Sequence, residues 1–376
     1  MPDIRIAFWN LENLFDTAAN DIATDFGFTP AEGWTDEVLD AKLNNLAEII
    51  KLMHNGAGPD LLGICEIENR AVAEKLIERI GRSDLKLTHI DSPDLRGIDT
   101  SLIYSTKTFA LAGPPSKAIV NHAAYLRYPT RDIFEVTLKV KANNAELKVL
   151  VNHWPSRRQG RYESEPFRMT LAERAGRIVD EYVRMPREEF MALPDTQASL
   201  SLLNQRWNRN VLVMGDLNDE PFDRSVLDYL QATKDTDLLE ELIRPAPNKN
   251  KPSMRAYLGR DVAKPGKPLA RNYLDIKAYL FNCMWRLMNE PDIGTHYFAG
   301  GVTGVKPTHT MDMLDQFIIS RGLFYGASGL KMDLEAVEIF KPKLLVTPKG
   351  RPRPFIRETK KGYSDHLPIQ GVIRTV

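Results

Sequence analysis

Short apolar runs recur along the chain, at residues 4–9, 60–65, 101–104, 147–151, 210–214 and 317–320. Runs of roughly four to eight apolar residues are typical of buried strands. Residues 133–141 instead alternate apolar and mainly polar side chains, which predicts a half-buried strand. Asn143-Asn144 follows, and asparagine tolerates the left-handed conformation of tight turns. We therefore expect an antiparallel hairpin over residues 133–151.

Helical periodicity lies between these runs. Residues 36–53 carry a stripe of apolar side chains at helical spacing, with Thr35 or Asp36 as the N-cap. Residues 71–81 and 166–184 are further amphipathic candidates, and residues 224–232 form a weaker one. Pro186 and Pro194 are expected to bracket a break.

A hairpin combined with strand–helix–strand segments predicts mixed sheets with helices on the outside. The stretches 244–310 and 341–361 are rich in Pro, Gly and Lys, and strand-like segments continue after each. We expect a single domain over residues 1–376, with insertions there and near residues 155–208.

Composition is that of an ordinary globular protein, with 43% hydrophobic and 27% charged residues. Only two cysteines are present, so no disulfide framework is expected. We see no signal peptide before the first apolar run and no run approaching the roughly 18 apolar residues that span a bilayer. A cytoplasmic location is therefore expected, with a monomer as the default oligomeric state.

The net charge is zero, but basic and acidic residues are unevenly distributed along the chain. Residues 244–271 and residues 341–361 each carry eight Lys or Arg against one acidic residue. Such basic segments beside an acidic remainder suit an anionic substrate held near carboxylate-bound cations. Solvated surface loops explain them equally well, and the sequence leaves both interpretations open.

Polar residues gather at the ends of the predicted strands. They are Asn10, Glu66, His153, Asp216 with Asn218, Asp315, and the tripeptide Ser364-Asp365-His366 before the last apolar run. Carboxylate and amide oxygens favour Mg²⁺, Mn²⁺ or Ca²⁺ over zinc. Such a cation neutralises phosphate oxygens and acidifies bound water, and a nearby imidazole can move a proton near neutral pH. The residue types therefore fit a phosphoesterase without a covalent intermediate.

With these residues the sequence resembles the endonuclease/exonuclease/phosphatase superfamily, which includes DNase I-like nucleases. The stretches that carry the resemblance occur in the family's order and extend over most of the chain. They are Phe8-Trp9-Asn10-Leu11-Glu12-Asn13, Ile64-Cys65-Glu66, Val151-Asn152-His153-Trp154, Gly215-Asp216-Leu217-Asn218, Leu314-Asp315-Gln316-Phe317 and Ser364-Asp365-His366. The resemblance implies an α+β fold, a four-layer α/β/β/α sandwich of two mixed β-sheets flanked by helices, with Mg²⁺ (or Mn²⁺) as cofactor.

The resemblance also implies roles. Glu66 and Asn10 would bind the metal ion, with Asp365 as a second or water-linked ligand. Asp216 and Asn218 would position the attacking water and the scissile phosphate. His366, oriented by Asp315, would be the acid–base group, and His153 a second imidazole at the phosphate. Apurinic endonucleases carry tyrosine in place of His153, so the chain departs from them there. Whether Asp216 or His366 takes the proton of the water stays open.

Several alternatives compete with these assignments. Asn10 could cap a turn, Asn13 competes with it, and Asp312 competes with Asp315. Arg157 and Arg158, close after His153, and Arg96 are candidate phosphate contacts, because guanidinium groups bind phosphate bidentately. Trp154 is expected in the core. The remaining histidines, His54, His89, His122, His296 and His309, have no partner motif and are expected to be surface or structural.

Three functions follow from this interpretation. The first is a phosphodiesterase or endonuclease, with nucleic acid as a partner whose binding should weaken steeply with salt. The second is a phosphomonoesterase, or a sphingomyelinase-like diesterase acting on phospholipid. The third, and the most distant, is a non-catalytic binding module.

Overall fold

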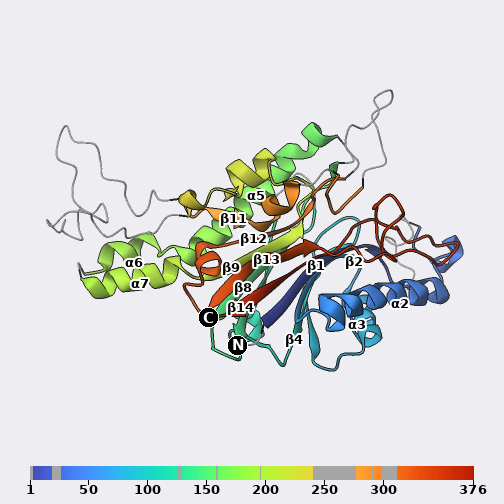
Figure 1. Ribbon diagram of the computed structural model, residues 1–376, viewed down its shortest axis with the longest axis horizontal. Helices are drawn as coiled ribbons and strands as arrows, with labels where there is room; N and C mark the ends of the chain where they lie inside the picture. The colour runs from blue at the N-terminus through green and yellow to red at the C-terminus, as the bar shows by residue number, and fades with distance from the viewer. Residues whose placement is uncertain are drawn as a thin grey trace.

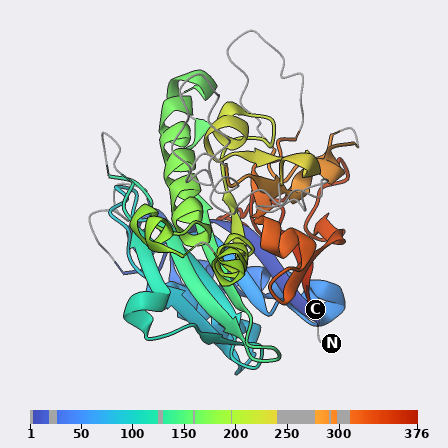
Figure 2. The same cartoon turned by 90° about the vertical axis from the view of Figure 1, so that its left-hand side faces the viewer.

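Two β-sheets pack face to face, and helices cover the outer face of each, so the layers run helix, sheet, sheet, helix (Figure 1, Figure 2). The computed structural model describes residues 3–18, 27–124, 129–157, 160–194, 196–239, 277–289, 292–297 and 311–376. Both sheets mix parallel and antiparallel pairs. The predicted four-layer α+β sandwich is therefore confirmed.

The first sheet has six strands in the order β13-β14-β1-β2-β4-β3. Its strands are β1 (Asp3–Leu14), β2 (Leu61–Ile67), β3 (Leu85–His89), β4 (Asp99–Ser105), β13 (Leu330–Ile339) and β14 (Ile369–Thr375). Strands β1 and β2 run parallel, so their carboxyl ends reach the same edge of the sheet.

The second sheet has eight strands, seven of them in the order β10-β11-β12-β9-β8-β7-β5, with β6 paired to β7. These strands are β5 (Phe109–Leu111), β6 (Ile119–His122), β7 (Ile133–Val140), β8 (Glu146–His153), β9 (Asn210–Asp216), β10 (Ala232–Thr233), β11 (Leu280–Asn282) and β12 (Asp315–Ile319). The predicted hairpin is confirmed, since β7 and β8 pair antiparallel. Strands β8 and β9 run parallel, like β1 and β2 in the first sheet.

The helices form the two outer layers. Helices α2 (Asp36–Leu52) and α3 (Arg70–Ile80) pack on the six-stranded sheet, whereas α5 (Arg161–Val183), α6 (Arg187–Ala192) and α7 (Gln197–Trp207) lie over the eight-stranded sheet (Figure 1). Two further short helices are α4 (Pro115–Ala118) and α9 (Arg321–Tyr325). Among the described residues, no helix is both long and apolar enough to cross a membrane.

Two details differ from the sequence-based expectations. The expected break between Pro186 and Pro194 contains α6, which begins directly after Pro186 because proline suits the start of a helix and not its interior. The weak helix expected over residues 224–232 is a five-residue π-helical turn, Ser225–Tyr229. The segment 155–208 supplies α5, α6 and α7, which build an outer layer, and its interpretation as an insertion stays a prediction.

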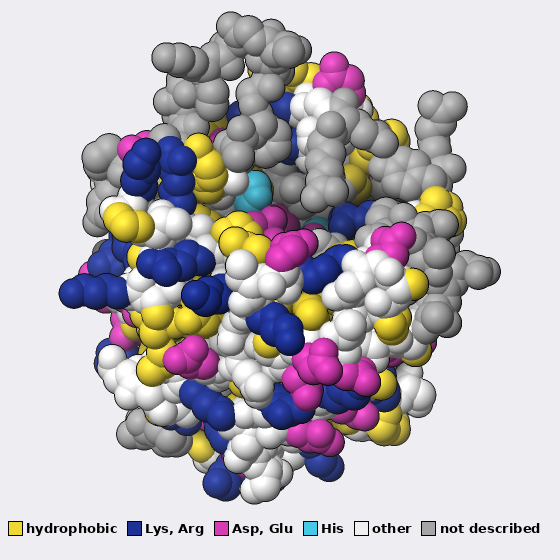
Figure 3. Space-filling view, turned by 90° about the vertical axis from the view of Figure 1, so that its right-hand side faces the viewer, with side chains coloured by type: hydrophobic (Ala, Val, Ile, Leu, Met, Phe, Trp, Pro, Cys, Tyr) yellow, Lys and Arg dark blue, Asp and Glu magenta, His cyan; other side chains and the backbone are white. Residues whose placement is uncertain are grey.

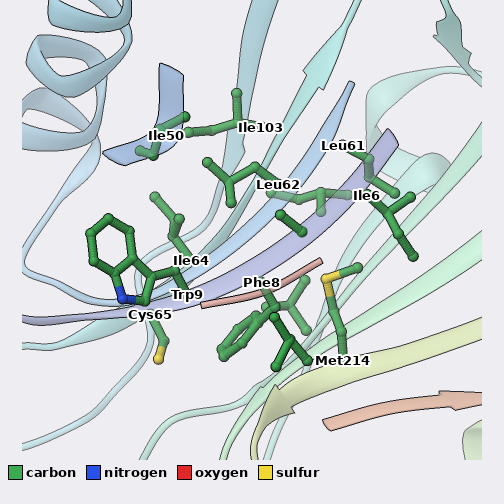
Figure 4. Packing of buried hydrophobic residues seen from close by; sticks show 14 of the residues in the cluster. Ile6, Phe8, Trp9, Ile50, Leu61, Leu62, Ile64, Cys65, Ile103 and Met214 are labelled. Carbon is green, nitrogen blue, oxygen red and sulfur yellow. The ribbon is translucent and has the colours of Figure 1, made fainter. Parts of the chain in front are cut away.

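The space between the sheets is filled by side chains that alternate along the strands. Figure 4 shows Phe8 of β1 beside Met214 of β9, while Leu62 and Ile64 of β2 point the other way, toward α2. Gly63 permits this contact between the sheets, because a Cβ there would lie 2.4 Å from the sulfur of Met214. Close packing of this kind leaves the strands rigid, so residues at their ends have fixed positions.

Candidate active site

His153, Asp216 and Asp315 lie at the same level of three neighbouring strands. His153 on β8 lies opposite Asp216 on β9, and Asp315 on β12 lies opposite Asp216 from the other side. Neighbouring strands are about 4.8 Å apart, so side chains from the three strands can interact. Nε2 of His153 lies 3.7 Å from Oδ2 of Asp216. Gly215 permits the close approach of β8, since a Cβ there would lie 2.2 Å from the carbonyl oxygen of Asn152.

Asn10 and Glu66 reach the same place from the six-stranded sheet. The side-chain amide of Asn10 donates a hydrogen bond to Oδ2 of Asp216 at 3.1 Å. Glu66 lies at an irregularity in β2, where the register with β4 shifts, and its φ is 59°. Such a bulge re-aims a side chain. It leaves Oε1 of Glu66 3.6 Å from Nε2 of His153.

His366 joins this group from the loop that precedes β14. Nδ1 of His366 lies 2.7 Å from Oδ2 of Asp315, and its Nε2 lies 3.7 Å from Oδ2 of Asp216. An ionised carboxylate only accepts hydrogen bonds, so the imidazole donates from Nδ1. This leaves Nε2 as the nitrogen directed at the other site residues.

Ser364 fixes the loop that carries His366. Its hydroxyl donates to the carbonyl oxygen of Asn10 at 2.7 Å and accepts from the amide of His366 at 3.0 Å. The indole of Trp9 donates to the carbonyl oxygen of His366 at 2.9 Å. The Ser364–Asn10 and Trp9–His366 hydrogen bonds join the last loop to β1, so they fix the position of His366 relative to Asn10.

The pKa values of the ionisable groups at the centre of the site are shifted in different directions. Burial opposes the charged form of His366, but the carboxylates of Asp315 and Asp216 outweigh it and raise the pKa of the imidazole well above its usual value. Burial lowers the pKa of His153 well below its usual value, and the charge of Arg131 adds to this. Burial also raises the pKa of Asp216 to about 6. At neutral pH the site therefore holds a protonated His366, a neutral His153 and an ionised Asp216.

Asn218 follows Asp216 in a left-handed turn with φ 50°. Its amide N–H donates to Oδ1 of Asp216 at 2.9 Å, and its side-chain amide donates to the carbonyl oxygen of Trp154 at 3.0 Å. Trp154 is fully buried, as expected. Asn218 therefore has a fixed place beside the row of Asp216 and His153.

Asp365 lies on the side of the site nearest Glu12, a residue that the sequence did not single out. Burial raises the pKa of Glu12 to about 7. The negative charges of Asp365 and Glu66 add to this shift, and the positive charge of Lys42 opposes it. Lys42 on α2 is only 2% exposed and donates a hydrogen bond to the carbonyl oxygen of Glu12. Three carboxylates and one buried cation therefore share this side of the site.

His296 corrects an expectation, because it lies at the site and not apart from it. Its ring centroid is 4.6 Å from that of His366, and its Nε2 is 3.9 Å from Oδ2 of Asp365. It comes from the segment 292–297, whose sequence has no strand-like or helical pattern that could have pointed to it. Arg131 also lacked a sequence signal. It donates to the carbonyl oxygens of His153 and Trp154 at 3.2 and 2.9 Å.

The candidate phosphate-binding arginines have different surroundings. Arg157 donates to the carbonyl oxygen of Asn218 at 2.7 Å, and its guanidinium contacts three carboxylates, those of Asp219, Asp223 and Asp312. Arg96 donates to the side chain of Asn13 at 3.0 Å. Arg158 lies outside the described residues. A direct phosphate contact stays a prediction for each of them.

Of the two basic segments, residues 244–271 lie outside the described residues. In the segment 341–361, the backbone amide of Phe355 donates to Oε2 of Glu12 at 2.8 Å. Arg357 donates to the carbonyl oxygen of Glu32 at 2.8 Å, and the guanidinium of Arg351 lies 3.8 Å from the ring centroid of Tyr297. This basic segment is thus attached to the body of the protein beside the site.

The strand ends that carry these residues lie at the right-hand side of Figure 1, the side that faces the viewer in Figure 3. That face is hollowed, with histidine and acidic side chains together in the hollow and Lys and Arg around it (Figure 3).

A family model described as the endonuclease/exonuclease/phosphatase family matches residues 5–193 of the chain. The chain belongs to the endonuclease/exonuclease/phosphatase family. The activities in this family's name all act on phosphate esters. The matched residues include Asn10, Glu66 and His153, whereas Asp216 and His366 lie beyond them.

Solved structures of this family share the fold over the whole chain. TDP2 from D. rerio, complexed with a single-strand DNA product, has 10% sequence identity and a TM-score of 0.51, covering 99% of each chain. The mannosyl-6-phosphatase from Bacteroides thetaiotaomicron has 12% identity and a TM-score of 0.50, also covering 99% of each chain. A search of curated proteins found no match. At these identities the likeness shows the fold alone.

The family generally uses a divalent metal ion, and the residues present fit one. Asn10, Glu12, Glu66 and Asp365 offer hard oxygen donors on one side of the site, the kind that Mg²⁺ and Mn²⁺ prefer. Oε2 of Glu66 accepts from the amide of Asn13 at 2.9 Å, while Oε1 is directed at His153. Burial raises the pKa of Glu12, the negative charges of Asp365 and Glu66 add to this, and a cation beside these carboxylates would oppose the shift.

Proposed function

We propose that the protein hydrolyses phosphate esters with Mg²⁺ or Mn²⁺, and that its most favoured substrates are phosphodiesters, including nucleic acid. The observation that carries the proposal is the pair formed by His366 and Asp315. Asp315 lies on β12, next to Asp216 on β9, and the imidazole of His366 joins it from the loop before β14, with Nε2 directed at Asp216. A protonated imidazole next to a buried, ionised carboxylate provides an acid and a base at one point.

The oxygen-rich side of the site would hold the metal ion through Glu66 and Asn10, with Asp365 as a second or water-linked ligand. A bound divalent cation would neutralise charge on the phosphate and acidify the attacking water. The other residues position the reactants and transfer protons.

Asp216 is the group that we assign to the water's proton, because it is ionised at neutral pH whereas His366 is protonated. Asn218 would position the phosphate beside it. His366, through Nε2, and the neutral His153 would contact the phosphate oxygens from the opposite side. Arg157 would act through Asn218, whose backbone it holds.

A substrate panel tests this function. We expect EDTA-sensitive hydrolysis with Mg²⁺ or Mn²⁺, faster on bis-p-nitrophenyl phosphate than on p-nitrophenyl phosphate, together with nicking of plasmid DNA. Monoester preference without nicking would favour the phosphatase alternative, and turnover of sphingomyelin the phospholipid alternative. Activity that survives EDTA would refute the metal-dependent mechanism.

Asp315→Asn should move the alkaline limb of the pH–rate profile to lower pH. The carboxylate of Asp315 helps to raise the pKa of His366, so removing its charge lowers that pKa and the imidazole loses its proton earlier. The measurement is kcat/KM against pH for the wild type and the variant. A lower rate with an unmoved limb would show that Asp315 only supports the structure.

A further inference from the structure

Three side chains that could bind a metal ion lie close together near the surface, and one of them is the proposed acid–base residue His366. Ligand atoms of His296, Asp365 and His366 lie within 4.8 Å of one another. Nε2 of His296 is 3.9 Å from Oδ2 of Asp365, and the two imidazole rings are 4.6 Å apart. The side chains are 17%, 37% and 6% exposed, so an ion can reach them from solvent.

Backbone pairing fixes His296 in this place. Its amide and carbonyl exchange hydrogen bonds of 3.1 and 2.8 Å with the backbone of Asp312, and it bridges to His366 as well. These contacts do not involve the imidazole. A substitution of His296 can therefore remove the ring without removing the pairing that holds the segment.

The separation of the three groups suits a small transition-metal ion. Zinc binds histidine nitrogen and carboxylate oxygen at about 2.0–2.2 Å. Two ligands of one zinc ion are then roughly 3 to 4 Å apart, depending on their angle. The 3.9 Å between His296 and Asp365 lies in that range, and the two atoms do not form a normal hydrogen bond at this distance.

The donor set differs from that of the oxygen-rich side of the site. Two imidazoles and one carboxylate favour zinc, nickel or cobalt over magnesium, which prefers oxygen donors. The other group around His366, formed with Asp216 and Asp315, is more deeply buried and already joined by the 2.7 Å contact to Asp315. The trio with His296 is the more accessible of the two.

We propose that His296, Asp365 and His366 form an inhibitory site for a transition-metal ion such as Zn²⁺, distinct from the metal site at Glu66 and Asn10 but sharing Asp365 with it. Nδ1 of His366 is held by Asp315, so the nitrogen that binds the ion is Nε2, which releases its proton to solvent when the ion binds. In the proposed function the same nitrogen contacts the phosphate, so a metal ion bound there would block that contact. The inhibition therefore rests on the proposed function. The bound ion would also occupy Asp365, which the proposed function assigns to the catalytic metal ion.

Cobalt titration of the tag-free, EDTA-treated full chain tests the site directly. We expect visible absorption bands of nitrogen-ligated Co²⁺ that stoichiometric Zn²⁺ abolishes and excess Mg²⁺ does not. His296→Asn should weaken this binding by at least about 10-fold, a conservative figure for a lost ligand. Glu66→Gln should retain it. His122→Asn is the matched control, because His122 is similarly exposed at 19% and pairs with Glu135 outside the site.

Inhibition supplies the second measurement. The Zn²⁺ concentration that halves Mg²⁺-supported hydrolysis should rise by at least about 10-fold in His296→Asn, in line with the weaker binding. Wild-type cobalt bands in His296→Asn, or their loss in Glu66→Gln, would overturn the site. If no phosphate ester is hydrolysed, the proposed function fails, while cobalt binding still decides whether this metal site exists.

Discussion

Replacing His366 with alanine is expected to lower kcat on a phosphodiester by about 10²–10⁴-fold, the usual contribution of a placed acid–base group. The imidazole is protonated at neutral pH because Asp315 and Asp216 outweigh the effect of burial on its pKa. Its Nε2 is directed at Asp216, where the reacting phosphate would lie. Steady-state kinetics with Mg²⁺ measure the loss, which should fall on kcat more than on KM.

Alanine also leaves the buried Asp315 without its partner, and breaking a buried ion pair is destabilising in itself. His366→Asn separates the two effects. The side-chain amide of asparagine can replace Nδ1 as a donor to Asp315, but it cannot exchange a proton. We expect near-wild-type thermal stability with the same loss of turnover. If His366→Asn stays active, the acid–base role is wrong; His122→Asn should leave turnover unchanged.

Much of the site could be predicted because its residues sit at the ends of strongly apolar strands. Asn10, Glu66, His153, Asp216 and Asp315 all continue or begin buried runs, and the structure brings them together at one edge of the sandwich. Parallel pairing of β1 with β2 and of β8 with β9 brings the carboxyl ends of these four strands to that edge, and β12 runs antiparallel to β9, so its amino end, with Asp315, reaches the same edge. Their catalytic roles stay proposals, but their proximity is observed.

Other site residues could not be predicted, for reasons that lie in long-range packing. Glu12 reaches the site through a backbone with φ 54°, which no apolar pattern announces. Lys42 follows the periodicity of α2 on a helix face that the sequence shows as apolar. Burial lowers the pKa of its ammonium group, and carboxylates from elsewhere in the chain oppose this shift. His296 depends on pairing with Asp312 and His366. Each of these contacts joins residues that lie far apart in the sequence.

Glu66→Gln should remove most metal-supported turnover and weaken Mn²⁺ binding by more than about 100-fold, the upper range for residues that only support a ligand. Glu66 occupies a bulge that directs its Oε1 toward the centre of the site. Glutamine keeps the shape of the side chain and one oxygen, so the variant removes charge and little else. Mn²⁺ titration followed by electron paramagnetic resonance measures binding without relying on activity.

Glu68→Gln is the matched control, because Glu68 lies two positions further on and accepts a hydrogen bond from the amide of Asp16 at 2.7 Å. It should bind Mn²⁺ as the wild type does. Equal Mn²⁺ affinity in Glu66→Gln and the wild type would place the metal ion elsewhere, with Glu12 and Asp365 as the remaining carboxylates on that side. Weak binding in Glu66→Gln that higher Mn²⁺ concentrations compensate, with kcat restored, would show that the carboxylate serves to hold the ion and takes no part in proton transfer.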